Sequence, residues 1–433
     1  MKRQLKNSKG ITLIALVVTI VVLIILTTIT INMTVGENGI IKKAQDAGKK
    51  VNEMEENTQS YINELQHELE NKVITNTIKP VEPQPPEPPK ETIEESKNTG
   101  KEFTEPKTEV TDSKGNKVVI PGGFKVPEDS GDTVQQGIVI EDVSASGDDN
   151  VKGSQFVWIP VGTFVKDDGS TSNEIVLGRY TFNTSNGTPT LKQAAYTTDN
   201  PENYKEKIGI DKNDYQFIEL DEYRPGIVDS SNRLNDLNAT ANNLKGFVDS
   251  ARINGGYYIA RYEASYASGT STSDYKAASK KSTANYESSM NYTTGTLWNF
   301  ITQLDASKIS INTYSKENAT VKSDLMNSYA WDTAIVFIQE AGRTNYANKK
   351  DGNGTLKNTG ATGDEVCKIN DMASNLRKCT TEYSTSTGSS IAYPFTDRGG
   401  YYNYSGYYTA SRNSRVSATN SNRSVGFRFS LYM

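Results

Sequence analysis

The apolar run from Ile11 to Ile31 constrains this chain more than any other feature, because it contains no charged residue. A helix needs about 20 apolar residues to cross the hydrocarbon core of a bilayer, and the run has that length. Positive charge before such a run favours a cytoplasmic leader. The sequence therefore predicts a single-pass protein of the cell membrane, with everything after Ile31 extracellular. The basic residues of the leader are Lys2, Arg3, Lys6 and Lys9.

Gly10 lies directly before the apolar run, whereas a secretory signal has its small-residue cleavage site after the apolar core. This arrangement resembles the N-terminus of type IV prepilins and pseudopilins. The resemblance implies that a membrane-bound prepilin peptidase removes residues 1–10 and that Ile11, the new N-terminal residue, is methylated. The family usually has Glu at the fifth mature position, where this chain has Ala15. That difference leaves assembly into a fibre open, and a plain single-span anchor is the alternative for residues 11–31.

Residues 32–77 have the spacing of a charged helix with one narrow apolar seam. The apolar residues recur at intervals of three and four, as on one face of a helix. The pattern predicts a stalk that lifts the rest of the chain off the membrane, either as a solvated helix or as one that self-associates along the seam. The seam comprises Ile40, Ala44, Ala47, Val51, Met54, Tyr61, Leu65, Leu69 and Val73.

Residues 78–109 are predicted to form a disordered spacer. Prolines favour extended polyproline geometry and prevent a helix. The acidic and Lys residues that follow have few large apolar neighbours, and such a segment cannot bury enough surface to fold. The prolines are Pro80, Pro83, Pro85, Pro86, Pro88 and Pro89.

Charge and residue usage argue against several classes of function. The formal net charge is −5, and no dense basic patch follows the leader, so nucleic acid is not an expected partner. His67 is the only histidine and falls in the predicted stalk, which argues against a His-based triad or a His-rich metal site. Cys367 and Cys379 are the only cysteines. In an extracellular segment they either form a disulfide or remain two reduced thiols.

The character of the chain changes at Val110, where short apolar runs begin to alternate with clusters of Gly, Asn, Asp and Ser. Such runs predict strands separated by turns. A helical spacing at Leu325–Gln339 predicts a helix, with an N-cap near Ser323 or Asp324. We therefore expect an α+β domain over residues 110–433. The expected strands lie within 118–124, 137–142, 155–161 and 255–263, and another helix is expected near 229–245.

Six segments, in their order along the chain, resemble the formylglycine-generating-enzyme (sulfatase-modifying-factor) family. The resemblance implies an irregular α+β fold related to that of C-type lectins. We expect the large aromatic residues near these segments to be core: Trp158, Tyr258, Trp331, Phe337, Phe427 and Phe429. The segments are Phe156-Val157-Trp158-Ile159-Pro160, Gly256-Tyr257-Tyr258-Ile259-Ala260-Arg261-Tyr262-Glu263, Ser328-Tyr329-Ala330-Trp331-Asp332-Thr333-Ala334, Ile369-Asn370-Asp371-Met372-Ala373-Ser374-Asn375-Leu376, Arg398-Gly399-Gly400-Tyr401 and Val425-Gly426-Phe427-Arg428.

Local chemistry explains some of these positions. The two glycines after Arg398 let the backbone turn tightly, while the guanidinium group makes a forked set of hydrogen bonds. Asp371 and Asn375 can bond backbone groups inside long loops that have no strand partner of their own.

The catalytic chemistry of that family is not expected here. Its enzymes bind copper through two cysteines, spaced five apart, shortly before the final Gly-Phe-Arg segment. The corresponding stretch here, Tyr401 to Ser424, contains no cysteine, so a thiolate copper site at that position is absent. No carboxylate pair or phosphate-binding loop stands out by spacing. We therefore predict that the protein is not an enzyme, with an oxidoreductase of this fold as the weakest alternative.

The stretch from Tyr401 to Arg415 is dominated by Tyr, Ser and Asn. Tyr provides rigid amphipathic contact area, and Ser and Asn provide adaptable hydrogen bonds, as in antibody paratopes. The sequence predicts a ligand-binding face here, and a loop that packs on its own domain is the alternative. The candidate residues are Tyr401, Tyr402, Asn403, Tyr404, Ser405, Tyr407, Tyr408, Ser411, Asn413 and Arg415.

The same stretch is also similar in place and composition to the randomised region of diversity-generating-retroelement variable proteins, which end in a C-type-lectin-like domain. The resulting hypothesis is a surface adhesin or receptor with an extracellular protein or glycan ligand. A structural minor pilin is the second hypothesis. No cofactor is required, although Asp351–Gly354 can supply oxygen ligands to Ca²⁺; spacing alone assembles no ligand set.

Overall fold

The structure is a computed structural model. It describes residues 91–205, 208–209, 216–219, 242–271, 273–286, 292–317, 319–351, 354–384, 395–416 and 421–433. These residues belong to one compact unit, which begins at Pro88. Both helices and strands occur in it, which confirms the α+β class. The leader, the apolar run, the stalk, the proline segment, and Gly10 and Ile11 all lie outside the described residues.

The main sheet has six strands in the order β13-β20-β10-β5-β4-β3, all antiparallel to their neighbours. Three of the strand predictions, at 137–142, 155–161 and 255–263, are confirmed as members of this sheet. The bounds are β3 Phe124–Lys125, β4 Val139–Asp142, β5 Gln155–Pro160, β10 Gly256–Ala260, β13 Lys322–Leu325 and β20 Phe429–Tyr432.

A second sheet has the order β18-β17-β16-β9-β8, and β19 pairs in parallel with β16. This sheet carries the Arg398-Gly399-Gly400 turn at the end of β17. The bounds are β8 Ile208–Gly209, β9 Gln216–Glu219, β16 Arg377–Ser384, β17 Phe395–Arg398, β18 Arg412–Val416 and β19 Val425–Phe427.

Four two-stranded hairpins and several helices complete the part of the chain that the structure describes. The hairpins are β1–β2 (Lys107–Thr111, Lys117–Pro121), β6–β7 (Gly178–Phe182, Pro189–Ala194), β11–β12 (Ser265–Ser268, Lys276–Ala278) and β14–β15 (Glu365–Val366, Ile369–Asn370). The α-helices are α3 Ile93–Thr99, α4 Asn242–Asn254, α5 Gln303–Thr313 and α6 Ser328–Glu340. The 3₁₀ turns are η1 Val134–Gln136, η2 Asn203–Lys205 and η3 Tyr346–Asn348.

Strand β10 is buried on both faces, which explains its unbroken apolar sequence. Side chains alternate between the faces of a strand. Tyr257 contacts Phe247 of α4 at a ring separation of 5.0 Å and donates a hydrogen bond to the carbonyl of Ala330 in α6. Tyr258 points to the opposite face, where its ring lies 5.0 Å from that of Trp158. Helices α4 and α6 therefore cover the face of the sheet that carries Tyr257, and Trp158 packs on the face that carries Tyr258.

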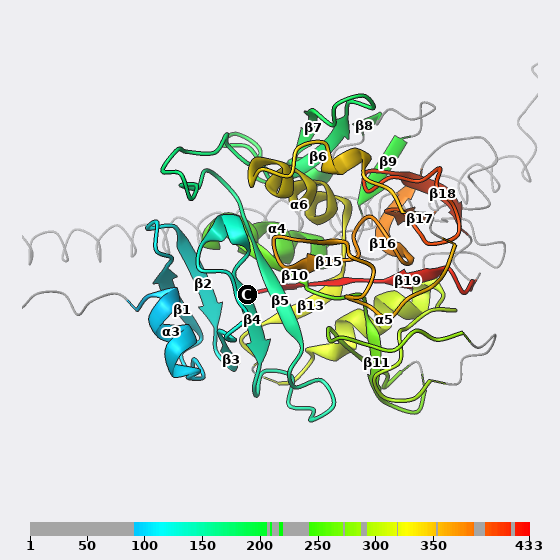
Figure 1. Cartoon of the computed structure of the whole chain (residues 1–433), viewed down its shortest axis with the longest axis horizontal. Coiled ribbons are helices and arrows are strands. Elements are labelled where there is room, and N and C mark those ends of the chain that lie inside the picture. The colour runs from blue at the N-terminus through cyan, green and yellow to red at the C-terminus, as the bar shows by residue number, and fades with distance from the viewer. Residues whose placement is uncertain are drawn as a thin grey trace, which may run out of the picture. The chain divides into compact units, whose positions relative to one another are not determined.

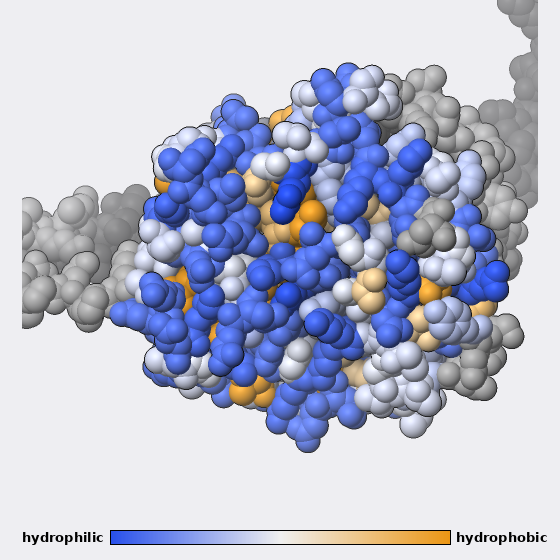
Figure 2. Space-filling model, in the orientation of Figure 1, coloured by the Kyte–Doolittle hydropathy of each residue, from blue (hydrophilic) through white to orange (hydrophobic). Residues whose placement is uncertain are grey.

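The predicted core is confirmed. Each of the six aromatic residues expected in the interior is at most 1% exposed, and Phe156 and Phe429 stack edge to face across the main sheet. The face drawn in Figure 2 is mainly hydrophilic, as expected when the large apolar side chains are inside. The buried residues expected from sequence are Trp158, Tyr258, Trp331, Phe337, Phe427 and Phe429.

Helix α6 begins at Ser328, three residues after Leu325, where the sequence predicted its start. Residues 322–325 extend as β13 and pair with β20, which leaves Asn327 to cap the helix. The Asn327 side chain accepts a hydrogen bond of 2.9 Å from the amide of Ala330. The N-cap prediction at Ser323 or Asp324 is therefore wrong, because sheet pairing takes those residues. Of the helix predicted near 229–245, only residues 242–245 lie in the described part; they begin α4, which runs on to Asn254.

The prediction that residues 78–109 are a disordered spacer is wrong for residues 91–109. Helix α3 has a capping box, in which the Thr92 hydroxyl and the Glu95 carboxylate each accept from the other residue's amide. Ile93 is fully buried and Phe103 is 5% exposed. These two large apolar side chains pack in the hydrophobic core and attach the polar segment to the domain. It lies beside β1 and β2, at the opposite end of the unit from β17 and β18 (Figure 1).

Replacing Ile93 with Ala tests whether α3 belongs to the cooperative fold. We expect Ile93→Ala to lower the free energy of unfolding by about 2 to 4 kcal/mol, because it leaves a cavity at a fully buried position. Urea denaturation measures the change. Glu94→Ala, on the exposed face of the same helix, is the control and should change it by less than about 0.5 kcal/mol. If Ile93→Ala lowers the free energy of unfolding as little as Glu94→Ala does, α3 is not part of the cooperative core.

Candidate functional site

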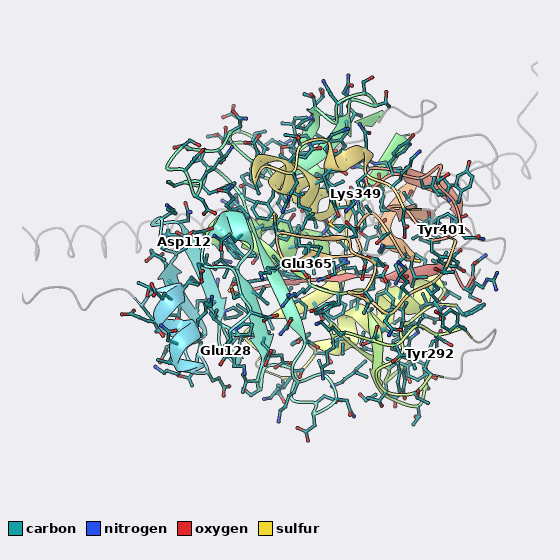
Figure 3. The ribbon with its side chains drawn as sticks, viewed as in Figure 1. Asp112, Glu128, Tyr292, Lys349, Glu365 and Tyr401 are labelled. Carbon is teal, nitrogen blue, oxygen red and sulfur yellow. The ribbon has the colours of Figure 1, made fainter. Side chains whose placement is uncertain are left out.

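The tyrosines after β17 form a ring cluster at the surface. Tyr401 is central, with ring separations of 6.1 Å to Tyr402, 6.3 Å to Tyr404 and 5.7 Å to Tyr407. Tyr404 and Tyr407 meet edge to face at 5.1 Å, and Tyr404 is 52% exposed. Figure 3 places Tyr401 at the end of the molecule that carries β17 and β18. The cluster of Tyr401, Tyr404 and Tyr407 is called the tyrosine patch below.

The patch is held from beneath by Tyr402, which is 7% exposed and packs with Ala284, Leu297, Leu356 and Leu376. Its amide donates to the carbonyl of Asn375, and its carbonyl accepts from the amide of Gly354. Rigid aromatic side chains on a fixed backbone lose little conformational entropy when they bind a ligand. The patch is therefore a pre-formed surface.

Arg377 supports the patch from the side. Its guanidinium group lies 5.0 Å from the centre of the Tyr401 ring and forms an ion pair of 2.7 Å with Asp397. Burial raises the pKa of Asp397 to about 6, and Arg377 offsets part of that rise. The guanidinium group is thus fixed between a carboxylate and an aromatic ring, and the ring gains a cation–π contact.

The turn that carries the patch depends on two glycines. Gly399 has φ +85°, and a Cβ at Gly400 would lie 2.3 Å from the carbonyl oxygen of Ala373. No L-residue side chain fits at Gly400 without movement of the backbone. The predicted tight turn after Arg398 is confirmed, and so are the predicted loop bonds: Asp371 accepts from the amide of Gly360, and Asn375 from that of Lys357.

Below the end of the Tyr-rich stretch, five charged side chains form what we call the arginine cluster: Arg179, Arg398, Arg412, Asp332 and Glu382. The arginines come from β6, β17 and β18, and the carboxylates from α6 and β16. Arg398 forks between Glu382 at 2.9 Å and Asp332 at 2.5 Å, as its predicted forked bonding requires. Four of the side chains are fully buried, and the fifth, that of Arg412, is 7% exposed.

Glu382 is the centre of the arginine cluster. It accepts from Arg179 at 3.2 Å, from Arg412 at 3.0 Å and from Arg398. Burial on its own raises the pKa of Glu382, but the three guanidinium groups outweigh burial and lower it to about 2. The carboxylate therefore stays ionised at any physiological pH.

A groove with a volume of about 440 Å³ lies between the β6–β7 hairpin and residues 408–412. Such a volume is within the range of small-ligand sites. Arg412 is the only charged residue among those that line it. The lining residues are Thr181, Phe182, Asn183, Thr184, Thr190, Asn348, Tyr408, Ala410, Ser411 and Arg412.

The predicted site residues divide into two sets. Asn403, Tyr404 and Ser405 are exposed, and Tyr401, Tyr407 and Tyr408 are partly exposed. Tyr402, Ser411 and Asn413 are at most 8% exposed, although Ser411 lines the groove. Arg415 lies in β18, and the structure does not describe its side chain.

Sequence reasoning missed the groove and most of the arginine cluster. The hairpin that forms one wall lies in a polar region to which no strands were assigned. Arg179 and Glu382 are far apart in sequence, and neither belongs to a recognisable sequence motif. A weak signal was present in the hairpin turn, where Asn183-Thr184-Ser185-Asn186-Gly187 has the composition of a tight turn.

The two cysteines are separate thiols, so the disulfide considered from sequence is not formed in this structure. Cys367 lies in the turn between β14 and β15, and Cys379 is buried in β16. Burial raises the pKa of the Cys367 thiol to about 12 and that of Cys379 still further. Neither is therefore a thiolate at neutral pH.

No group of three or more His, Cys, Asp or Glu side chains in the described ranges is placed to hold a metal ion. The predicted Ca²⁺ loop is described only at its ends, since residues 352 and 353 lie outside those ranges. No helix among the residues that the structure describes is long and apolar enough to span a bilayer. Comparison of the sequence with models of known protein families and with curated proteins found no match to either.

Proposed function

We propose that this chain is a membrane-anchored surface protein whose folded unit binds an extracellular ligand through the tyrosine patch. The observation that carries the proposal is the surface group of three tyrosines whose rings contact one another on a fixed turn, with Tyr404 52% exposed. Aromatic rings that are pre-positioned and half exposed are typical of binding hot spots. The apolar run at Ile11–Ile31 supports the anchor, and the basic leader supports a cytoplasmic N-terminus.

The placement of the patch suits display. The folded unit begins near α3, and the patch lies at the opposite end, beside β17 and β18 (Figures 1 and 3). A chain that enters at one end and carries its binding residues at the other presents them away from its attachment point. The stalk and proline segment predicted before residue 91 would extend that reach.

A proposal about the fold accompanies the proposed function. We infer a C-type-lectin-like unit related to formylglycine-generating enzymes, supported by the order of the six segments and by the burial of the six aromatic residues expected in the core. We also infer a non-catalytic protein. In support, the two cysteines are separate thiols, Cys367 partly exposed and Cys379 buried, and burial raises the pKa of both. The prepilin-like start and peptidase processing at Gly10 remain proposals from sequence alone.

Truncating the patch tests the proposal. We expect Tyr404→Ala and Tyr407→Ala each to weaken ligand binding by about tenfold or more, the loss typical of an interface hot spot. A screen of extracellular proteins and glycans against the purified protein identifies the ligand, and titration calorimetry then measures the affinity of each variant.

The matched control is Ile253→Ala, which removes an apolar side chain that is 69% exposed on α4, outside the patch. It should leave binding unchanged, and circular dichroism should show all three variants folded. Unchanged binding by both tyrosine variants would rule out the patch as the site.

A further inference from the structure

The proline segment of this chain, residues 80–89, has a proline at every third position. A polyproline helix has three residues per turn, so residues three apart lie on the same face. In that geometry, which the composition favours, one face of the segment consists of proline rings alone. The segment also carries Glu82 and Glu87 and contains no Lys or Arg. The residues of this proline face are Pro80, Pro83, Pro86 and Pro89.

The tyrosine patch has the chemistry that recognises such a face. Extended proline-rich segments dock on surfaces lined by aromatic side chains. In the patch, the ring of Tyr407 lies 5.7 Å from that of Tyr401 and 5.1 Å from that of Tyr404. A polyproline helix is stiff before it binds, and the tyrosines are held on a fixed turn, so neither side loses much conformational entropy.

Two lysines lie beside the patch, on the segment 349–357. Lys350 is exposed, and its ammonium group is 5.4 Å from the centre of the Tyr408 ring. Lys357 is partly exposed and follows directly on a leucine that packs with Tyr402. Neither lysine forms an ion pair with a residue that the structure describes. The only carboxylate of this segment, Asp351, accepts a hydrogen bond from a backbone amide. The lysines are complementary in charge to the two glutamates of the proline segment.

We propose that the tyrosine patch binds the proline segment of a second copy of this chain. The inference rests on the proposed function, because it names the ligand of the same patch. The proline segment joins the folded unit at α3, and the patch lies at the opposite end of that unit (Figure 1).

The length of the proline segment excludes the patch of its own copy. Ten residues of polyproline geometry span about 31 Å. A folded unit of this size has a radius of gyration of about 20 Å and is therefore about 50 Å across. The segment is thus too short to return to its own patch. Two copies that lie antiparallel place each patch beside the other's proline segment, so that both contacts form in one symmetric pair.

A synthetic peptide of residues 79–91 with a fluorescent label is the probe, and fluorescence anisotropy measures its binding to the detergent-solubilised full chain. Replacing two residues of the proline face, Pro83→Ala and Pro86→Ala together, should weaken the binding about tenfold or more, because these rings contact the tyrosines. The matched control is the peptide with Pro85→Ala and Pro88→Ala, which loses two prolines from another face. It should weaken the binding by less than about threefold. Equal weakening by the two peptides overturns the inference.

Reversing the charge of the peptide tests whether this chain's own segment is the ligand. Glu82→Lys and Glu87→Lys together should weaken the binding about fivefold or more, and added salt should weaken the binding of the unmodified peptide. If the reversed peptide binds as tightly as the unmodified one, the patch accepts any proline-rich ligand, and the inference is overturned.

Substitutions in the protein show where the peptide binds. Tyr404→Ala should weaken peptide binding about tenfold, whereas Ile253→Ala, outside the patch, should leave it unchanged. Analytical ultracentrifugation of the solubilised chain should show self-association that Tyr404→Ala weakens and that an excess of the unmodified peptide competes away. Peptide binding that survives Tyr404→Ala, or a chain whose association neither change affects, overturns the inference.

The failure of this inference can be told from the failure of the proposed function. If the peptide does not bind, but a ligand from the screen of extracellular proteins and glycans does and Tyr404→Ala weakens its binding, the proposed function stands and the inference fails. If neither the peptide nor any ligand of the screen binds, both fail.

Discussion

Glu382→Gln is expected to lower the free energy of unfolding by about 3 to 5 kcal/mol, because it removes the buried carboxylate that pairs with Arg179, Arg398 and Arg412. Gln has the same shape as Glu, so the loss reports charge and not a cavity. Chemical denaturation followed by tryptophan fluorescence measures it, since all three tryptophans are at most 1% exposed in the folded state. Asp149→Asn, at a residue whose side chain is 89% exposed, is the control and should cost less than about 1 kcal/mol.

The pH dependence separates this charge effect from a packing effect. The pKa of Glu382 is about 2 in the folded protein, below its ordinary 4.5. Its contribution is therefore complete above pH 4.5 and is lost as the pH falls through 2. The Glu382→Gln variant should show a smaller loss of stability on acidification than the unmodified protein. A change in stability below about 1 kcal/mol, or an unchanged acid limb, would contradict the role given to this carboxylate.

Lys378→Met is expected to cost about 3 to 5 kcal/mol as well, because it removes the cation that pairs with the buried carboxylate of Glu263. The Lys378 ammonium group lies 3.0 Å from Glu263 and also donates to the carbonyls of Ser374 and Asp371. Both partners are 1% exposed. Lys205→Met, which removes a lysine from an exposed ion pair of 2.7 Å, is the control and should have little effect on denaturation.

The double variant Lys378→Met/Glu263→Gln should recover about 1 kcal/mol or more of that loss, because no unpaired charge is left buried. Burial raises the pKa of Glu263 to about 6, against the opposing effect of Lys378. A raised carboxyl pKa gives stability that is present below pH 4.5 and lost as the pH rises through 6. Without Lys378 the loss on going from pH 6 to pH 8 should steepen. No recovery in the double variant would show that Lys378 acts through its carbonyl bonds alone.

The fold class could be predicted because it depends on local patterns. Val157, Ile159 and Tyr257 belong to apolar runs too short for helices, and such runs, when rich in β-branched and aromatic residues and bounded by glycines, favour strands. Helix α6 was found from its spacing, but its start was not, since pairing of β13 with β20 is a long-range contact. The segment at α3 was misjudged for the same reason: Ile93 finds its partners only in the folded domain.

The candidate site could be predicted only in outline. Tyr404 is exposed to solvent and Tyr407 is partly exposed, but Tyr402, one residue from Tyr401, is buried against Leu356 and Leu376. Composition describes a loop as a whole, whereas burial depends on which side of the loop each residue faces. No pattern within the loop distinguishes the exposed tyrosines from the buried one.

The sequence alone determined the apolar run at Ile11–Ile31, the α+β class, the aromatic core and the position of the Tyr-rich turn, because these follow from composition and short-range spacing. Only the tertiary structure decided the groove and the arginine cluster beside it. Arg179, Asp332 and Glu382 meet in that cluster from segments far apart in the chain. Coulomb interactions depend on distance in space, and the chain brings these groups together only when the second sheet, α6 and the β6–β7 hairpin have packed.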